Sequence, residues 1–312
     1  MRISVIIPAF NSSKCIGRAL TSVKAQGIDN LEVIIADDGS TDGTGAKAIE
    51  IMPEATVVRL AENTGAAAAR NLALRRSTGE MIALLDSDDE WVPGKLQRQV
   101  RFLQDHPDFG LCGSGHVLVC KDGSLVEFEG RNPKDWRKEL HFAQSFHGAS
   151  TPLMRREVLE RVGLLDERLR VLEDWDWMLR ISRDFKVSIL PEALTLIHEN
   201  NPSDPDYTVQ STAHFINKHR DEFSRYGSVH SRNVVSQHYE NAARNLFRHR
   251  RPGEGCSMLW DSFHTAPLRN PPLLAAFPIA AIDALAGTHF LADILTRRNR
   301  IPLQPDRHRR SA

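Results

Sequence analysis

Three carboxylates follow a buried apolar run in the segment LLDSDD at positions 84–89. Asp86 and Asp88 are two positions apart, so in an extended segment their side chains point the same way and can meet one ligand. Packed carboxylates repel one another unless a cation lies among them, and oxygen ligands suit hard ions such as Mg²⁺ or Mn²⁺. The segment therefore predicts a site for a metal ion with diphosphate as co-ligand. The alternative is a solvated acidic turn that caps a helix beginning near Pro93.

A second acidic cluster, DDGSTD at positions 37–42, also follows a buried run. Asp38 could accept hydrogen bonds from a nucleobase or a ribose, and Gly39 permits close approach of the backbone. The alternative is an Asx-turn in which Ser40 or Thr41 starts the next helix.

Between the two clusters lies the segment ENTGAAAARN at positions 62–71. Its small residues let a helix pack tightly, and Arg70 is placed to meet phosphate oxygens. A well-packed Ala-rich helix with a surface arginine explains the segment equally well when it is read in isolation.

The segment EDWDW at positions 173–177 combines carboxylates with tryptophans. One helical face gathers Trp175, Met178, Leu179 and Ser182, so Asp174 lies in the first turn of an amphipathic helix. The helix dipole favours a carboxylate there, which would keep Asp174 ionised and able to take a proton. The aromatic neighbours could form a platform for a sugar ring. The alternative is plain capping by Glu173 and Asp174, with the tryptophans in the core.

The elements that carry these residues alternate between strands and helices. We expect strands at 3–7, 31–36, 55–60 and 81–85, and helices at 15–25, 45–51 and 65–75. This alternation predicts βαβ units and a mostly parallel sheet. Ligands bind at the carboxyl ends of the strands in such sheets, and the polar motifs fall at those ends.

The later part of the chain changes character. We expect a strand-like stretch at 111–128 with a turn at 121–124, helices at 155–162 and 174–182, and short strands at 187–190 and 194–197. After Asn200 the chain is helical and rich in His and Arg. We therefore predict one domain over 1–200, in two halves that divide near residue 110, and a helical C-terminal extension with a basic tail at 201–312.

Four ordered motifs together resemble the family 2 glycosyltransferases. They are SVIIPAFN at 4–11, DDGSTD at 37–42, NTG at 63–65 with ARN at 69–71, and DSDD at 86–89. The resemblance covers residues 1 to about 200. It implies that residues 1–110 are a nucleotide-sugar-binding half and residues 111–200 an acceptor-binding half of the same domain. It implies the GT-A form of the α/β class, with a mostly parallel central sheet flanked by helices and a C-terminal helical extension, and it implies an inverting, metal-dependent transferase.

The resemblance also implies roles for individual residues. The nucleotide-sugar would contact Pro8, Ala9, Asn11, Asp38, Arg70, Asp86 and Asp89. Asp38 would face a uracil-type base, and Arg70 would lie near the base or the diphosphate. Asp88 would hold the Mn²⁺ or Mg²⁺ ion, and Asp174 matches the family's general base.

Two later segments carry weaker signals. His198 resembles a late histidine that contacts the metal or the diphosphate in related enzymes, but the arginine that precedes it in many of them is missing from Thr195-Leu196-Ile197-His198. A surface or packed histidine is the alternative. The segment 146–151 lies where the family receives its acceptor; alternatively, Ser150 or Thr151 caps the helix at 155–162.

Composition limits the partners. Lys+Arg and Asp+Glu each total 40 and the formal net charge is zero, so nothing calls for bulk binding of nucleic acid. The four cysteines form no CxxC pair, which fits a reducing compartment, and we expect a cytoplasmic protein. The apolar stretch 273–282 precedes a tail rich in arginine (Arg297, Arg298, Arg300, Arg307, Arg309 and Arg310). It is either a docking helix with a solvated tail or a peripheral contact with the inner face of a membrane.

The leading hypothesis is transfer of a sugar from a UDP- or dTDP-sugar to a hydroxyl of a saccharide or lipid-linked saccharide, in synthesis of a cell-surface polysaccharide. A nucleotidyltransferase would carry a G-x-G-T-R loop after the first strand, and a dehydrogenase would carry G-x-G-x-x-G. The chain instead reads Pro8-Ala9-Phe10-Asn11 there. A non-catalytic nucleotide-sugar-binding protein is the remaining alternative, although mere binding requires no base such as Asp174.

Overall fold

The computed structural model describes residues 1–142, 149–200, 203–267 and 269. The chain divides into two compact units, residues 1–201 and 202–312, and each is described by itself. The predicted halves 1–110 and 111–200 both fall in the first unit, where strands from both belong to one sheet.

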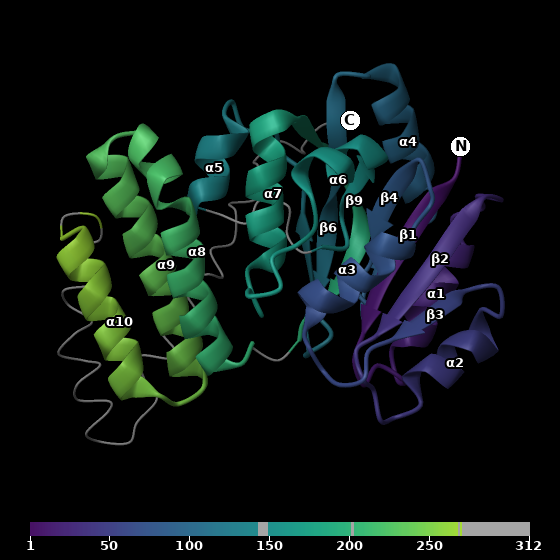
Figure 1. Cartoon of the computed structure of the whole chain (residues 1–312), viewed down its shortest axis with the longest axis horizontal. Helices are drawn as coiled ribbons and strands as arrows, with labels where there is room; N and C mark the ends of the chain where they lie inside the picture. The colour runs from purple at the N-terminus through teal and green to yellow at the C-terminus, as the bar shows by residue number, and fades with distance from the viewer. Residues whose placement is uncertain (143–148, 201–202, 268, 270–312) are drawn as a thin grey trace, which may run out of the picture. The chain divides into compact units, whose positions relative to one another are not determined.

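The first unit is built on a mixed sheet whose strand order, over the described residues, is β3-β2-β1-β4-β8-β6-β9-β5, with β7 paired to β6 (Figure 1). The strands are β1 (Ile3–Ala9), β2 (Leu31–Asp37), β3 (Thr56–Arg59), β4 (Met81–Leu84), β5 (Glu90–Trp91), β6 (Phe109–Val119), β7 (Leu125–Phe128), β8 (Leu153–Arg155) and β9 (Lys186–His198). β1 pairs in parallel with both β2 and β4, and β2 pairs in parallel with β3. The mostly parallel α/β sheet expected from the sequence is confirmed.

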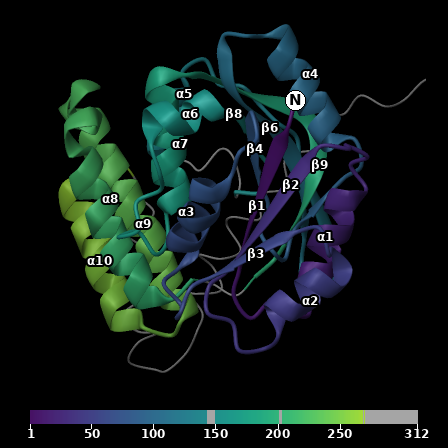
Figure 2. The ribbon, with the colours of Figure 1, turned by 45° about the vertical axis from the view of Figure 1, so that its right-hand side comes forward.

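Helices cover both faces of this sheet. They are α1 (Ile16–Lys24), α2 (Thr44–Ile51), α3 (Ala66–Arg76), α4 (Lys95–Asp105), α5 (Trp136–Phe142), α6 (Arg156–Val162) and α7 (Glu173–Asp184). Figure 2 shows α1 and α2 on one side of the sheet and α3 on the other. Every residue of β1 is buried, because a parallel strand in the middle of such a sheet is covered from both sides.

The main core lies between the sheet and the helices α1 and α4. Its alternate β1 residues Ile3, Val5 and Ile7 pack in one cluster with residues of α1 and α4 such as Leu20 and Leu96. On α3 the small side chains Ala69 and Ala73 are fully buried, which lets this helix approach the sheet closely and brings its first turns to the carboxyl ends of β1 and β2.

Some elements within residues 90–198 differ from those expected from the sequence. The two short strands expected at 187–190 and 194–197 are one strand, β9, in which the pairing with β6 passes from Leu190 to Ala193 through an irregularity at Pro191 and Glu192. Such a bulge keeps a strand continuous where proline prevents regular pairing. The short elements β5, β8 and α5 have no expected counterpart, because two to seven residues carry too little periodicity.

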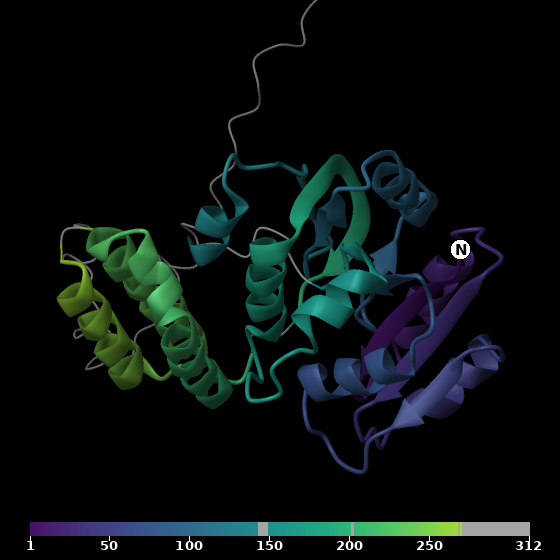
Figure 3. The same ribbon diagram turned by 45° about the horizontal axis from the view of Figure 1, so that its top comes forward.

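The second unit contains three helices in its described part, α8 (Pro205–Arg225), α9 (Ser228–Arg248) and α10 (Pro252–Thr265). α9 packs against both α8 and α10 (Figure 3). Asp204 begins α8 by accepting hydrogen bonds from the backbone amides of Asp206 and Tyr207, with Pro205 in the first turn. No helix among the described residues is long and apolar enough to cross a membrane. The apolar stretch 273–282 and the arginine-rich tail lie outside the described residues.

Candidate active site

A cavity of about 270 Å³ opens at the carboxyl ends of β1, β2 and β4. It is lined by Pro8, Ala9, Phe10, Asp38, Asn63, Gly65, Ala66, Ala69, Arg70, Asp86, Ser87, Asp88 and Asn200. Parallel strands end at the same edge of a sheet, so three motifs that are far apart in the sequence meet here. Of the predicted substrate contacts, Pro8, Ala9, Asp38, Arg70 and Asp86 line the cavity, as does the predicted metal ligand Asp88.

Asp38 connects the β2 end to the loop before α3. Its Oδ1 accepts hydrogen bonds from the backbone N–H and the hydroxyl of Thr64 (2.8 and 3.1 Å), and its Oδ2 accepts one from the N–H of Gly65 (2.8 Å). The carboxylate therefore fixes the first turn of α3 at the cavity wall. The next residue, Gly39, has φ +74°, and a Cβ there would lie 2.7 Å from the carbonyl carbon of Glu62, so only glycine fits this close approach.

Asn11 lies beside the cavity lining. It has φ +48°, and its side-chain oxygen accepts a hydrogen bond from the N–H of Thr41 (2.9 Å), while its own N–H donates to the hydroxyl of Ser40 (2.9 Å). These bonds tie the loop after β1 to the loop after β2. The helix start proposed at Ser40 or Thr41 is wrong, because α2 begins at Thr44.

Arg70 links the acidic residues after β4 to the start of α7. One terminal nitrogen, Nη2, lies 2.6 Å from Asp86 Oδ1, and the other, Nη1, lies 2.6 Å from Glu173 Oε1. The side chain is buried, which rules out the alternative of a surface arginine. Nε of Arg70 has no hydrogen-bond partner within the described part of the chain.

Glu173 and Asp174 form the first turn of α7. Glu173 is buried and burial raises its pKa, with the negative charge of Asp174 acting in the same direction and Arg70 opposing both. Leu172, which precedes them, has φ +67°, a strained conformation for a branched side chain. Strain of this kind is tolerated where neighbouring structure holds a functional segment in place.

Asp174 is half-buried, and its Oδ1 accepts a hydrogen bond from the N–H of Trp175 (2.7 Å). Burial raises the pKa of Asp174, Arg70 lowers it, and Asp86 raises it further, with a net upward direction. The helix N-terminus was expected to favour the ionised form, but burial has the larger effect on this carboxyl. A raised pKa brings a carboxylate closer to the range in which it is an effective base at neutral pH.

Asp88 and Asp89 lie in different surroundings although they are adjacent. Asp88 lines the cavity, and its Oδ2 accepts a hydrogen bond from the side-chain amide of Asn200 (2.7 Å). Asp89 is 3% exposed, and both of its oxygens are engaged, Oδ1 by the N–H of His198 (3.0 Å) and Oδ2 by the hydroxyl of Ser150 (2.5 Å). Asp89 therefore lies behind the cavity wall and joins the loop after β4 to the end of β9.

The imidazole of His198 is oriented toward an acid and lies outside the cavity lining. Its Nε2 is 2.8 Å from Oε1 of Glu90, which also lies 3.5 Å from Nε of Arg18. Arg18 in turn donates to the backbone oxygen of Asp88 (2.9 Å). His198 thus supports the acidic loop through Glu90 and through its own backbone N–H.

Sequence reasoning missed the role of Ser150 in orienting the acidic loop. Besides donating to Asp89, Ser150 accepts a hydrogen bond from the N–H of Asp86 (3.0 Å), and its backbone oxygen accepts one from Nε1 of Trp91 (2.8 Å). It does not cap α6, whose N-cap is Arg155. No sequence signal near Ser150 announces these long-range contacts.

The sequence also did not predict a role for Arg170 or Asn200. Asn200 lines the cavity, and Arg170 contacts two residues that line it. Nη2 of Arg170 donates to Oδ1 of Asn63 (2.8 Å), and its guanidinium lies against Gly65, where a Cβ would be 3.0 Å from Nε. The only sequence signal for a role of Arg170 was its position three residues before the EDWDW segment.

Among the described residues, no three His, Cys, Asp or Glu side chains are close enough together to bind a metal ion by themselves. Two carboxylates, Asp86 and Asp88, do line the cavity. Burial raises the pKa of Asp88, and the charge of Asp86 raises it further. A cation between them would relieve this repulsion, and the missing ligands would have to come from the substrate or from water.

Acidic residues at the ends of the parallel strands, with a second acidic pair at the start of α7, fit the glycosyltransferase class that the sequence motifs indicate. The chain belongs to glycosyl transferase family 2, whose family model matches residues 4–163. TuaG of Bacillus subtilis strain 168, named for teichuronic acid biosynthesis, is 33% identical over 171 residues, which cover 54% of this chain and 68% of TuaG.

Other relatives are matched over a smaller share of their length. The Escherichia coli protein WfgD, a UDP-Glc:alpha-D-GlcNAc-diphosphoundecaprenol beta-1,3-glucosyltransferase, is 38% identical over 104 residues, or 32% of this chain and 40% of WfgD. The uncharacterized glycosyltransferase alr2836 of Nostoc is 33% identical over 175 residues, and the chain spans about half of its length (54%).

Two solved structures share the fold at lower identity. Residues 1–349 of TarS from S. aureus, in complex with UDP-GlcNAc, align with a TM-score of 0.63 and 19% identity over 96% of this chain and 92% of that one. The mannosyltransferase PcManGT from Pyrobaculum calidifontis, in complex with GDP-Man and Mn²⁺, aligns with a TM-score of 0.52 and 22% identity over 96% and 86%.

Proposed function

We propose that this chain is an inverting, metal-dependent glycosyltransferase that moves a sugar from a nucleotide-sugar, UDP- or dTDP-linked, to a hydroxyl of a saccharide. The observation that supports this most strongly is the junction at Arg70, which holds the cavity residue Asp86 and the α7 residue Glu173 together through two contacts of 2.6 Å. Donor-binding residues and the proposed base residue Asp174 are thereby parts of one site.

The donor's nucleoside would occupy the cavity beside Pro8, Ala9 and Asp38. Asp38 already accepts three hydrogen bonds from Thr64 and Gly65, so we assign it first to holding the cavity wall and second to facing the base. Arg70 lines the same cavity, and its unsatisfied Nε–H is a donor whose acceptor would arrive with the substrate.

The residues present fit a hard divalent cation. Asp88 would hold Mn²⁺ or Mg²⁺ with Asp86 beside it, because both carboxylates line the cavity and the charge of Asp86 raises the pKa of Asp88. When bound, the ion would neutralise charge that develops on the departing diphosphate. Asp89 and His198, both held by neighbouring groups, would orient the loop that presents Asp88.

Asp174 would act as the general base. It would accept the proton of the acceptor hydroxyl, and the hydroxyl oxygen would attack the anomeric carbon from the face opposite the nucleotide. The bond from the anomeric carbon to the diphosphate oxygen breaks as the new glycosidic bond forms. A single displacement inverts the anomeric configuration, so an α-linked donor gives a β-linked product.

The acceptor class is inferred from relatives. WfgD acts, by its name, on a diphosphoundecaprenol-linked sugar, and TuaG is named for synthesis of teichuronic acid. We extend these to this chain as a proposal that the acceptor is a saccharide, free or lipid-linked, used in assembly of a cell-surface polysaccharide.

Calorimetric titration with UDP tests the donor and the metal together. We expect UDP to bind in the presence of Mn²⁺ and to lose at least about tenfold in affinity with EDTA. Without the cation, the negative charges of Asp86 and Asp88 would repel the diphosphate. GDP serves as the control nucleotide. Equal UDP affinity with and without EDTA would contradict the metal, whereas no binding of UDP or dTDP under either condition would contradict the donor class.

A catalytic protein is separated from a non-catalytic binding protein by slow hydrolysis of the donor. Water can replace the acceptor at the base, so a UDP-sugar should be hydrolysed slowly without acceptor. A protein that binds the UDP-sugar but leaves it intact even with a panel of acceptors would be a binding module.

A further inference from the structure

A second and larger cavity, of about 680 Å³, lies in the first unit at the other ends of β6 and β9. β6 and β9 run parallel, and their first residues, Phe109 and Lys186, line this cavity, whereas the last residue of β9, His198, belongs to the acidic loop of the donor site. α7 connects the two places. Its first turn holds Asp174, and its far end contributes Ser182 and the following Phe185. Ser182 lies eight positions after Asp174, or about 12 Å along the helix axis.

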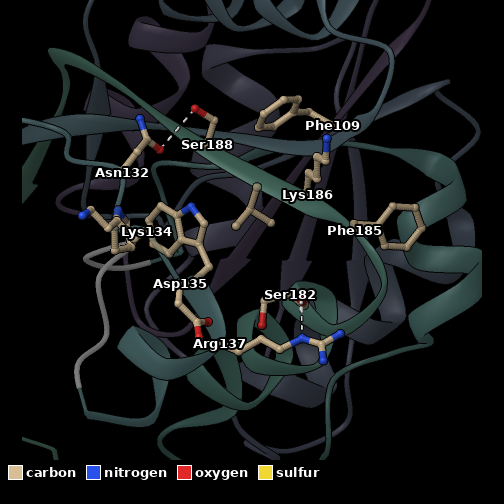
Figure 4. A pocket seen from close by; sticks show the side chains of 12 residues that line it. Phe109, Asn132, Lys134, Asp135, Arg137, Ser182, Phe185, Lys186 and Ser188 are labelled. Carbon is tan, nitrogen blue, oxygen red and sulfur yellow. Dashed lines mark hydrogen bonds between the residues drawn. The ribbon is translucent and has the colours of Figure 1, made fainter.

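The cavity has aromatic walls from three separate segments, Phe109 at β6, Trp136 at the start of α5 and Phe185 after α7. Figure 4 shows Phe109 and Phe185 on one side with Lys186 between them. The ring of Phe185 packs against Gly110, where a Cβ would lie 2.6 Å from the ring, so its place depends on this glycine. The guanidinium of Arg161 lies over the same ring, 5.3 Å from its centre, and holds it in place as well. Fixed aromatic rings in a cavity wall are suited to the apolar face of a sugar.

The opposite wall is fixed by the backbone of β9. Asn132 donates from Nδ2 to the oxygen of Ile189 (2.9 Å), and its Oδ1 accepts from the N–H of Ile189 (2.8 Å) and from the hydroxyl of Ser188 (3.2 Å). Gly130 N–H donates to the oxygen of Pro191 (3.0 Å), at the irregular point of β9. The segment before α5 is therefore held against the strand, and the cavity is largely formed before any ligand arrives.

The lining carries an excess of positive charge. Its cations are Lys134, Arg137 and Lys186, against the one acid Asp135, which accepts from the N–H of Lys138 at the start of α5. Lys186 is 2.7 Å from Asp108, and Nε of Arg137 donates to the backbone oxygen of Ser182 (3.1 Å). Within the described residues, Lys134 makes no hydrogen bond or ion pair, so its charge is available to a ligand.

Lys134 and Arg137 come from the segment around the start of α5, and Lys186 comes from β9. Figure 4 shows the three side chains at different sides of the cavity, so they do not converge on one point as a phosphate site would require. Their spread, interleaved with aromatic rings, matches an extended ligand in which acidic groups alternate with flat apolar faces. We propose that this cavity binds an acidic oligosaccharide, one whose sugar rings lie against Trp136 and Phe185 and whose acidic groups pair with Lys134 and its neighbours.

Calorimetry on the full chain tests this with trigalacturonic acid as the probe and maltotriose as its neutral counterpart. We expect the acidic trisaccharide to bind more tightly than the neutral one, and its affinity to fall with added salt because exposed charges are screened. Lys134→Glu should weaken binding about three- to fivefold. Lys138→Glu, an exposed change of the same kind on α5 outside the cavity lining, should leave it within about twofold.

Trp136→Ala should weaken both trisaccharides about tenfold, because stacking does not depend on the charge of the sugar. UDP affinity and melting temperature measured on each variant show whether the fold and the donor site are intact. Excess UDP should not displace the trisaccharide, so a failure of UDP binding would bear on the proposed donor and not on this cavity. Displacement by UDP, equal affinity for the acidic and neutral probes, no binding of either probe, or an unchanged affinity in Lys134→Glu would each overturn the proposal.

Discussion

Two groups of residues form the site, and they are positioned in different ways. The first group lies in the loops after β1, β2 and β4, and the second group lies in later segments of the chain. Asp38 and Asp86 follow neighbouring parallel strands, and the sheet alone places them at one edge. Ser150, Glu173 and Asn200 come from a loop, a helix start and the segment after β9. Ser150 contacts Asp86 and Asp89, Glu173 contacts Arg70 of α3, and Asn200 contacts Asp88. The residues after the parallel strands therefore bring charges to the cavity, and the residues of the later segments hold those charges in place.

If this division holds, the transfer rate should depend most on the few residues that face the acceptor. We therefore expect the largest loss of rate from a change at Asp174. Asp174→Asn preserves size and helix capping but removes the proton acceptor. A positioned base contributes about 10²–10⁴-fold in rate, so we expect the transfer rate to fall by that factor while UDP affinity and melting temperature stay nearly unchanged. Steady-state kinetics with the selected donor provides the measurement.

Asp184→Asn, an exposed change at the far end of α7, is the matched control and should leave the rate near its starting value. If Asp174→Asn retains a near-normal rate, the carboxylate is only a cap. Asp176 is a poor substitute as base, because it is fully buried and paired with Arg180 at 2.9 Å.

A change at Lys95, the fully buried first residue of α4, should alter the pH dependence of stability without altering the transfer rate. Its Nζ donates to Oε1 of Gln99 (2.8 Å) and lies 4.5 Å from the ring centre of Trp91, and burial lowers its pKa to about 7. Between pH 7 and the ordinary lysine pKa of 10.5, the unfolded chain binds a proton that the folded chain does not, so stability rises with pH.

Lys95→Met removes this titration. The stability of the parent protein, relative to the variant, should increase from pH 7 to pH 10 by at most about 4 kcal/mol, and transfer at a fixed pH should stay within about twofold. Denaturant unfolding of both proteins at the two pH values measures the difference. Parallel pH curves for the two proteins would show that Lys95 keeps an ordinary pKa.

A smaller effect is expected at Ser150, which orients the acidic loop without facing the cavity. Ser150→Ala removes the donor to Asp89 and the acceptor for the N–H of Asp86, so the loop should hold the metal and the diphosphate less well. We expect a loss of about tenfold in UDP affinity in the presence of Mn²⁺, at the lower end of what supporting residues contribute at metal sites. Calorimetry is the measurement.

Ser114→Ala is its control, a buried serine of β6 whose hydroxyl lies 3.4 Å from that of Thr195, away from the acidic loop. It should leave UDP affinity unchanged. An equal loss of affinity in both variants would mean that any buried serine in this sheet matters as much as Ser150.

Most of the first hundred residues could be predicted from the sequence, because periodicity identifies βαβ units and parallel strands then bring their ends together. That argument placed Asp38 and Asp86 at one edge without any knowledge of contacts. It could not find Ser150 or Asn200, since their partners lie 61 and 112 residues away and no local pattern reports such a distance. The family resemblance implied a substrate contact for Asp89, whereas in the structure both of its oxygens accept hydrogen bonds from protein donors.

The proposed mechanism uses one base, Asp174, and a single displacement at the anomeric carbon of a donor bound at the ends of the parallel strands. Proton NMR of the first turnovers of a UDP-α-sugar, with water or a saccharide as acceptor, tests this most directly. We expect the β-anomer to appear first and its formation to be lost in Asp174→Asn. Initial release of the α-anomer would contradict the single displacement and require a covalent intermediate or a different site.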